Sequence, residues 1–166
     1  MAASKLKLAL LAALLAIASR AHAANNCPWL TEATAGGLLG GPAVNTFMDA
    51  ANGKPAVCHF EEKDSDGLRT LTITVEVNPD AHVKLNAMMH DCGAANQLLQ
   101  AIGNEAAVCA MDTKHKQISE RVVGRVRDQV FTIVIASTLK EDNVLNKDTL
   151  MTKIYTASEQ VAGNLF

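Results

Sequence analysis

Aromatic residues and net charge are both scarce in this chain. Its 166 residues include one Trp, one Tyr and four Phe, and its formal net charge is −2. Sequence-independent binding to nucleic acid needs a positive field that releases counterions, so this charge balance argues against such a partner. With few large aromatic side chains to bury, we expect covalent cross-links to contribute to stability.

Motifs that mark common catalytic and cofactor sites are also missing. No serine lies in a Gly-x-Ser-x-Gly turn, and no glycine-rich phosphate loop follows an expected strand. The acidic residues of 61–66 are interpreted as a solvated turn, with a glycosidase-type carboxylate pair as the alternative. His82 and His90 lie about two helical turns apart, and we interpret them as surface histidines rather than metal ligands. We therefore expect no catalytic residue, no cofactor and no metal.

The first 23 residues have the three parts of a secretory signal peptide. Lys5 and Lys7 make a positive start, residues 8–18 form an uninterrupted apolar run, and Ala21-His22-Ala23 has the small-x-small pattern of a cleavage site. The apolar run is shorter than the about 20 residues that a membrane anchor needs. We predict cleavage before Ala24 and a periplasmic or secreted protein without an integral membrane anchor.

The remaining segment, 24–166, has the size of one domain. Removal of the leader takes away three basic residues and no acidic one, so 12 basic residues face 17 acidic ones and the net charge becomes −5. No linker, internal repeat or low-complexity stretch divides this segment. We predict a single domain.

Four cysteines, Cys27, Cys58, Cys92 and Cys109, remain after cleavage. In an exported chain an even number of cysteines is most simply interpreted as disulfides. Three pairings are possible, and we favour Cys27–Cys58 with Cys92–Cys109, in which each bond closes a local loop. A zinc site is the alternative, but no Cys-x-x-Cys spacing is present.

Alternation of apolar and polar residues predicts antiparallel strands. It is clearest in 70–77, where Leu71, Ile73, Val75 and Val77 alternate with threonines and a glutamate. Apolar residues on both faces of 129–137 indicate a central strand that is covered on both sides.

Turn and cap residues place the other elements. Asn52-Gly53 predicts a hairpin turn, and Arg127-Asp128 predicts a second one. Val83, Ala87 and Met88 are expected on the inner side of a helix. The further expected elements are strands at 44–50, 56–62, 105–111 and 117–126 and helices at 28–39, 78–90, 96–102 and 146–166. Hairpins with helices before, between and after them predict an α+β domain, with an antiparallel β-sheet packed against helices.

The order of four short motifs resembles a known group of proteins. Cys58-His59-Phe60 is followed by 103–106, by the strand 130–137 and by the C-terminal segment 159–166. This order is similar to that of small exported bacterial proteins, many of them lipoproteins of unknown function, that are placed near the PsbP-like fold. The resemblance implies a PsbP-like α+β fold and brings no catalytic residues. The chain lacks the lipidation cysteine of those lipoproteins.

Three arginines are the candidate binding residues. Arg121, Arg125 and Arg127 fall on one strand face by the two-residue period of a strand. On a net-acidic protein, such a row is suited to a carboxylate, a phosphate or an acidic partner. The alternative is cross-strand pairing with acidic neighbours such as Glu76 or Glu120.

These features favour an exported, non-enzymatic binding or accessory module of the cell envelope. Its expected partner is an envelope protein or a small anionic ligand. The alternative is a small secreted hydrolase whose active site the sequence does not reveal. A deep pocket with converging polar groups would favour the hydrolase, whereas a flat or grooved face with arginines would favour the binding module.

The leader can be tested by mass. We expect the protein in the soluble envelope fraction to begin at Ala24, because signal peptidase cleaves after a small-x-small pattern. Intact-mass spectrometry of the purified protein measures this start directly. Retention of residues 1–23, or a diacylglycerol-modified Cys27, would contradict the prediction.

Overall fold

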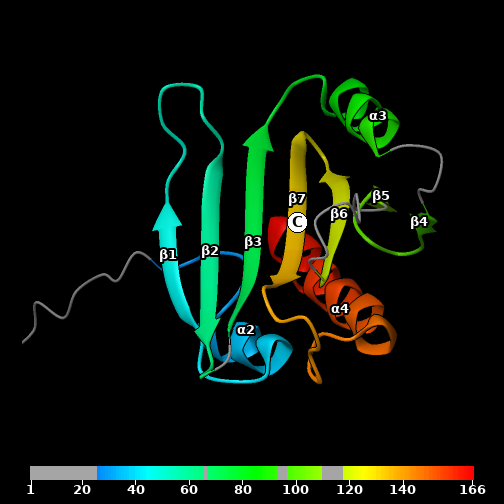
Figure 1. The fold of residues 1–166 in the computed structure, drawn as a ribbon. Coiled ribbons are helices and arrows are strands. Elements are labelled where there is room, and N and C mark those ends of the chain that lie inside the picture. The colour runs from blue at the N-terminus through cyan, green and yellow to red at the C-terminus, as the bar shows by residue number, and fades with distance from the viewer. Residues whose placement is uncertain (1–25, 66, 93–96, 110–117) are drawn as a thin grey trace, which may run out of the picture.

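The computed structural model describes residues 26–65, 67–92, 97–109 and 118–166. Within these ranges seven strands form one sheet and three helices pack on it (Figure 1). The strands are β1 (Val44–Met48), β2 (Ala56–Lys63), β3 (Leu68–Val77), β4 (Gln97–Leu99), β5 (Glu105–Cys109), β6 (Ile118–Val126) and β7 (Gln129–Ser137). The helices are α2 (Glu32–Leu39), α3 (Ala81–Asp91) and α4 (Lys147–Leu165).

The sheet is antiparallel throughout, with the strand order β1-β2-β3-β7-β6-β5-β4. Strand β7 is the fourth of the seven strands in this order, so its predicted central position is confirmed. The expectation that it is covered on both sides is wrong in part, because Thr132, Val134 and Ala136 on its outward side are only half-buried. Helices α2 and α4 lie on one face, and α3 lies on the other face over β6 and β7. The α+β class and the antiparallel sheet packed against helices are therefore confirmed.

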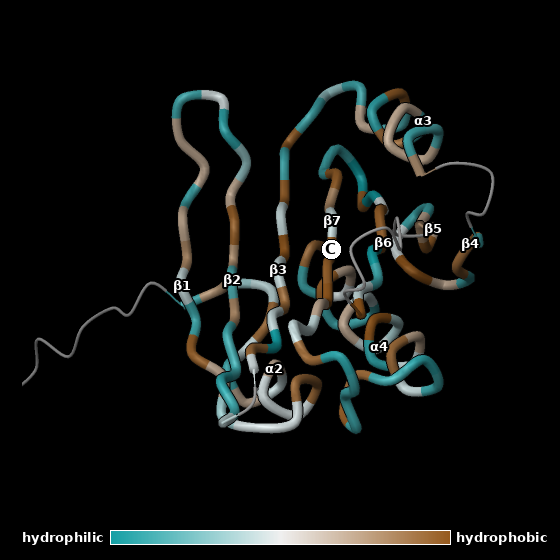
Figure 2. Tube along the Cα trace, viewed as in Figure 1, coloured by the Kyte–Doolittle hydropathy of each residue, from teal (hydrophilic) through white to brown (hydrophobic). Residues whose placement is uncertain are grey.

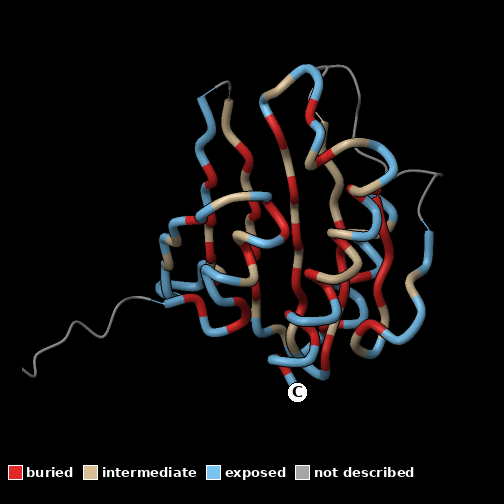
Figure 3. Tube along the Cα trace, turned by 90° about the horizontal axis from the view of Figure 1, so that it is seen from below, coloured by how far each residue is buried: buried red, intermediate tan, exposed pale blue. Residues whose placement is uncertain are grey.

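The main core lies between the sheet and the helices α2 and α4. Along β3 the side chains alternate between buried and half-buried, and Figure 2 shows brown residues alternating with paler ones there. Leu71 and Ile73 of β3 are fully buried with Phe60 of β2 and with Ile154 of α4. Seen from below in Figure 3, buried residues follow the strands and exposed residues lie at the periphery.

The two turn sequences form the predicted hairpins. Asn52 and Gly53 both have positive φ angles, 53° and 72°, and the Lys54 N–H donates to the Ala51 carbonyl at 2.9 Å. This is the backbone that favours Asn-Gly in a tight hairpin turn. Arg127, at φ 55°, opens the turn between β6 and β7.

Both favoured disulfides are present. Cys27–Cys58 joins the segment before α2 to β2, and Cys92–Cys109 joins the C-cap residue of α3 to β5. On the loop-closure model each stabilises the domain by roughly 3–4 kcal/mol. Disulfides of this kind are consistent with a location outside the cytoplasm.

Helix α2 is shorter than the helix predicted for 28–39. It begins at Glu32, and the Thr31 side chain caps it by accepting from the Thr34 N–H at 3.1 Å. The residues before Thr31 instead run into the core, where Cys27 is cross-linked and Trp29 is buried. The disulfide and the burial of Trp29 outweigh the preference of Pro28 for a first helical position.

The helix predicted for 96–102 is wrong, because the described part of this segment, 97–102, contains a strand and no helix. Gln97–Leu99 pairs with β5, with Leu98 opposite Ala107, and Ala101 then turns the chain at φ 61°. A segment this short has no clear hydrophobic period, so the partner strand decides its structure.

The inner side of α3 differs from the prediction at Val83 and Ala87, whereas Met88 packs against the buried residues as predicted. Val83 is 67% exposed, and Ala87 is exposed as well. Ala81 and Leu85 are the buried residues, and Leu85 packs on Ala107 and Val123 of the sheet. The disulfide at Cys92 directs this face of the helix toward β5.

Asn146 caps α4, with its side chain accepting from the Thr149 N–H at 3.0 Å. The signal peptide, the start at Ala24 and the ends of the expected elements near 96, 111 and 117 lie outside the described residues.

A buried ion network closes one end of the core. Arg69 Nη1 donates to Glu62 Oε2 and Arg69 Nε donates to Asp142 Oδ2, both at 2.8 Å. Asp142 also accepts from the Ser137 hydroxyl at 2.6 Å and from the N–H of Leu145 at 2.9 Å. The Asp142 side chain is fully buried, so this network fixes the loop that leads into α4.

Hydrogen bonding controls the ionisation of Asp142. Burial alone would raise its pKa, but the hydrogen bonds from Arg69, Ser137 and two backbone N–H groups outweigh burial and hold the pKa well below its usual range. Asp142 is therefore an anion throughout the physiological pH range and serves as the counter-ion of Arg69.

We expect Asp142→Asn to lower the free energy of unfolding by about 3 kcal/mol near pH 7, since it weakens charge-assisted hydrogen bonds in a buried pair. A carboxyl with a depressed native pKa stabilises the fold above its unfolded pKa of about 3.9, and this contribution falls as pH drops below that value. The deficit of the variant should therefore be constant from about pH 7 to 5 and narrow below about pH 4. Urea unfolding at several pH values measures it.

Asp64→Asn is the matched control, because Asp64 lies 3.8 Å from the same guanidinium but its side chain is 49% exposed. It should cost less than about 1 kcal/mol. A deficit for Asp142→Asn that widens on acidification would contradict the assignment.

Candidate functional site: strand β6 and the open sheet face

Strand β6 places its arginines according to the pleat of the sheet. Val122 and Val126 are fully buried on the α4 side. Because successive side chains alternate, Arg121 and Arg125 lie on the opposite side, where Val123 packs under α3. Two of the three predicted arginines thus share one face.

Arg125 is paired with an acidic residue of the neighbouring strand. Its Nη2 lies 3.2 Å from Glu105 Oε1 and its Nε lies 3.4 Å from Glu105 Oε2, directly across the β5–β6 register. His82 Nδ1 of α3 lies 3.1 Å from the same carboxylate. The hydrogen bond from Arg125 lowers the pKa of Glu105, and the hydrogen bond with His82 lowers it further. Burial of Glu105 has the opposite, smaller effect.

Cross-strand pairing with an acidic neighbour is the alternative that the sequence offered for the arginines. Arg125 does form such a pair, but its partner is Glu105 and not Glu76 or Glu120. Glu76 pairs with Lys84 of α3 at 3.3 Å instead. Glu120 is half-buried, points to the α4 side by strand alternation, and has a pKa that burial raises.

Arg127 does not join the other two arginines. It lies in the β6–β7 turn, its backbone N–H donates to Asn104 Oδ1 at 2.7 Å, and its guanidinium lies over the Phe166 ring at 5.7 Å from the centroid. Phe166 follows α4, so this guanidinium is at the helix-covered side of the sheet end. The left-handed turn breaks the two-residue period on which the predicted row of three rests.

Arg121 has no acidic partner among the described residues. Its Nη2 contacts Cys92 Sγ at 3.7 Å, and its Nε is buried without a hydrogen-bond partner. The side chain is half-buried. Its register neighbours are Val134 of β7 and Cys109 of β5.

Next to Arg121 the sheet has a broad face that no described helix covers. We call it the open face, meaning the outward side of β1, β2 and β3 together with the half-buried outward positions Thr132, Val134 and Ala136 of β7. In Figure 1 these strands stand clear of the helices on the side toward the viewer, while α4 lies behind β7 and β6. Its central positions are half-buried and uncharged, and they are Thr70, Thr72, Thr74, Thr132, Val134 and Ala136.

His59 is the titratable side chain nearest the middle of the open face. Its Nδ1 lies 2.9 Å from Thr72 Oγ1 and its Nε2 lies 3.1 Å from Glu61 Oε1. The side chain is 34% exposed. Sequence reasoning placed His59 on a strand face with Glu61 but did not find its contact with Thr72, because that contact depends on the β2–β3 register.

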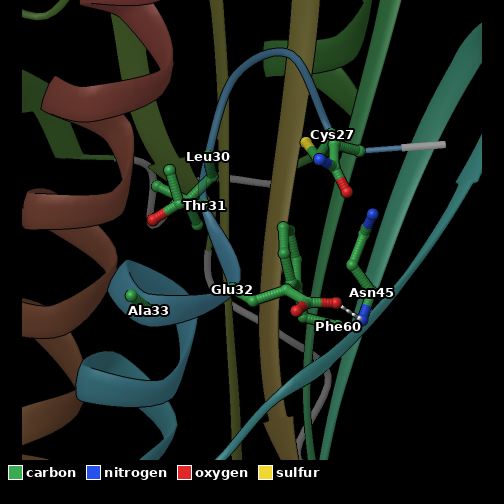
Figure 4. A pocket seen from close by; sticks show the side chains of 8 residues that line it. Cys27, Leu30, Thr31, Glu32, Ala33, Asn45 and Phe60 are labelled. Atoms are coloured by element: carbon green, nitrogen blue, oxygen red, sulfur yellow. Dashed lines mark hydrogen bonds between the residues drawn. The ribbon is translucent and has the colours of Figure 1, made fainter. Parts of the chain in front are cut away.

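A cavity of about 280 Å³ lies on the other side of the sheet, between the start of α2 and β1. Figure 4 shows Glu32 and Asn45 at its wall and Phe60 at its base. The Glu32 carboxylate accepts from the Asn45 backbone N–H at 2.9 Å. None of the described groups with a shifted pKa lines this cavity.

The histidines of α3 are dispersed. His82 contacts Glu105, whereas the His90 side chain is 92% exposed. In the described ranges, no three His, Cys, Asp or Glu side chains gather as they would around a metal ion. Likewise, none of the three described helices has the length and apolar character that crossing a bilayer requires.

Comparison with known proteins finds no matching family model, no matching curated protein and no matching solved structure.

The pair between Arg125 and Glu105 can be tested by charge reversal. We expect Arg125→Glu to destabilise the domain by about 1 kcal/mol, because it places two carboxylates directly opposite each other. Adding Glu105→Arg should recover at least half of that loss, and urea unfolding of the single and double variants measures the coupling. Independent, additive effects of the two substitutions would contradict the pairing.

Proposed function

We propose that the protein is an exported, non-enzymatic binding or accessory module of the cell envelope that docks on a protein partner through the open face. The observation that carries the proposal is the composition of that face. Its six central positions hold short side chains, four of them threonine, and none carries a charge, although Lys, Glu, Arg and Asp are the residues most often found on exposed surfaces.

The energetics of covering this face support docking. Threonine and valine are β-branched and stiff at χ1, so they lose little conformational freedom when a partner covers them. Lysine, glutamate and arginine lose much more, at about 1.5–2 kcal/mol for each buried side chain. Since association must offset such ordering costs, a face of short branched side chains binds with a smaller entropic penalty.

Charged side chains border the uncharged central positions of the open face. Glu61 and Lys63 of β2 and Glu76 of β3 lie at its margin, and Glu76 is already paired with Lys84. A face with an uncharged centre and a charged margin is the arrangement found in protein interfaces.

Two expectations from the sequence, export and the resemblance to a family, support the proposal. The N-terminal pattern of residues 1–23 favours secretion, and the two disulfides are consistent with an oxidising compartment. The resemblance to small exported bacterial proteins with a PsbP-like fold favours an accessory role over catalysis.

Site-specific photo-cross-linking in the producing cell tests the proposal. We expect a photoreactive residue at Thr72 to give a discrete adduct with a protein, because Thr72 lies at the centre of the open face. The same residue at Gln160, which is exposed on α4 on the other side of the sheet, is the matched control and should give none.

A second substitution makes the test specific. Thr132→Lys places a charge in the face and should reduce the Thr72 adduct at least about tenfold, while stability changes by less than about 1 kcal/mol. Absence of an adduct at Thr72, or an equal adduct at Gln160, would overturn the proposal.

A further inference from the structure

Strand β1 is an edge strand of the sheet, and no strand of the described part of the chain pairs with its outer edge. Its five residues include no charged side chain and no proline, and Val44 and Met48 are 68% and 56% exposed. Natural proteins usually protect such an edge with charges, prolines or bulges, because unpaired backbone groups bind other strands. None of these devices lies within β1, whose register with β2 is regular.

The Asn45 N–H shows which backbone groups of β1 face outward. It donates to the Glu32 carboxylate of α2 at 2.9 Å, so it points away from β2. The direction of the backbone groups alternates along an antiparallel strand, and the N–H and C=O of Phe47 therefore face the same outer edge. The Glu32 carboxylate occupies the position where a carbonyl of an added strand would accept a hydrogen bond from Asn45.

The cavity of about 280 Å³ between α2 and β1 lies beside this edge. Directly paired residues of neighbouring strands place their side chains on the same side of a sheet. A residue opposite Asn45 on an added strand would therefore direct its side chain toward the cavity that Asn45 lines. Leu30 and Phe60 give the cavity apolar surface, and Glu32, which is exposed, is the one charged residue among those that line it (Figure 4).

From these observations we propose that β1 binds an extended segment of a partner protein as an additional strand, with a basic side chain of that segment beside Glu32. Hydrogen bonds to the backbone of Asn45 and Phe47 provide affinity, and the cavity selects the side chain. Lysine and arginine have an apolar stem that fits against Leu30 and Phe60 and a positive head for the carboxylate.

Charge argues against a second copy of this chain as the occupant. Pairing of two β1 edges about a twofold axis would bring two Glu32 carboxylates to one short edge, where like charges repel. Strand β1 has no basic side chain to offset them. A basic segment of another protein complements both Glu32 and the net-acidic chain.

This inference rests on the proposed function for the kind of partner, and it describes how that partner is held. The outward side of β1 belongs to the open face, and Val44 and Met48 are exposed there. An added strand would place every second side chain next to these two residues. Strand addition and docking on the open face therefore cover one continuous surface.

The test is an NMR titration of the ¹⁵N-labelled protein with the end-blocked peptide TVTRTVT, which has one basic residue at its centre. We expect saturable shifts of the Asn45 and Phe47 amide signals, with a dissociation constant in the millimolar range. Methylation of the arginine nitrogen of the peptide blocks the edge that faces β1, so it should abolish the shifts. Methylation of the next threonine nitrogen blocks the opposite edge and should leave them unchanged.

The preference for a basic side chain is tested with the peptide TVTETVT and the variant Glu32→Gln, which keeps an acceptor for the Asn45 N–H. Wild type should bind TVTRTVT about fivefold more tightly than TVTETVT, as expected for an exposed charge pair, and Glu32→Gln should remove this preference. Glu159→Gln is the matched control and should keep it, because Glu159 is exposed on α4, which packs on β6 and β7.

The amide spectrum of each variant confirms that it is folded. Absence of a saturable shift with TVTRTVT, equal effects of the two methylated peptides, or equal affinity for the two charged peptides would overturn the inference. Shifts of the Asn45 and Phe47 signals on dilution of the protein alone would also overturn it, because they would assign the edge to a second copy.

Failure of the inference and failure of the proposed function give different results. An adduct at Thr72 without binding of TVTRTVT leaves docking on the open face and removes strand addition. Binding of TVTRTVT that depends on Glu32, without an adduct at Thr72, leaves the peptide-binding edge of β1 and removes docking on the open face.

Discussion

The buried guanidinium of Arg69 is the interaction on which the arrangement of this domain depends. Glu62, Arg69 and Ser137 lie side by side on three adjacent strands, and Asp142 reaches them from the loop before α4. The four side chains join β2, β3, β7 and that loop through bonds of 2.6–2.8 Å. A buried arginine is stable only when its donors are satisfied, so the strand ends and the loop must adopt one relative position.

At the same end of the core, α2 and α4 contact each other on the face of the sheet that they cover. Lys153 of α4 donates to the Leu38 carbonyl at the end of α2 at 2.5 Å, which supplies the cation that the last turn of α2 lacks. Burial and the nearby charge of Arg69 lower the pKa of this lysine, while Asp142 opposes them. With α2 and α4 both fixed on one face, the domain has its main core there, and the far side of β1, β2 and β3 is not needed for burial.

The four described arginines lie in different environments. Arg69 is a structural cation inside a carboxylate network, and Arg125 is half of a partly exposed pair with Glu105. Arg121 is half-buried, and its Nε has no hydrogen-bond partner among the described residues. Arg127, in the β6–β7 turn, lies over the Phe166 ring.

The strands and hairpins could be predicted from sequence because their signals are local. The alternation in 70–77 and the Asn52-Gly53 turn are repeated in the structure with small shifts of the ends. The segment 97–102 could not be predicted in the same way, because three paired residues carry too little periodicity to distinguish a strand from a helical turn. The inner face of α3 was also beyond sequence reasoning, since Cys92 and the sheet position set the rotation of that helix.

For the candidate site, the sequence by itself predicted that Arg121, Arg125 and Arg127 share one strand face by the two-residue period, with Val123 between the first two. It also determined the fold class and the favoured cysteine pairing, because hydrophobic period and cysteine spacing are properties of the chain. Only the tertiary structure decided which partner each described arginine has. Glu105 reaches Arg125 through the β5–β6 register and Phe166 reaches Arg127 from the end of α4, and neither contact is encoded in local spacing. Electrostatic partners are set by distances in space, so they became visible only when the strands and α4 were in place.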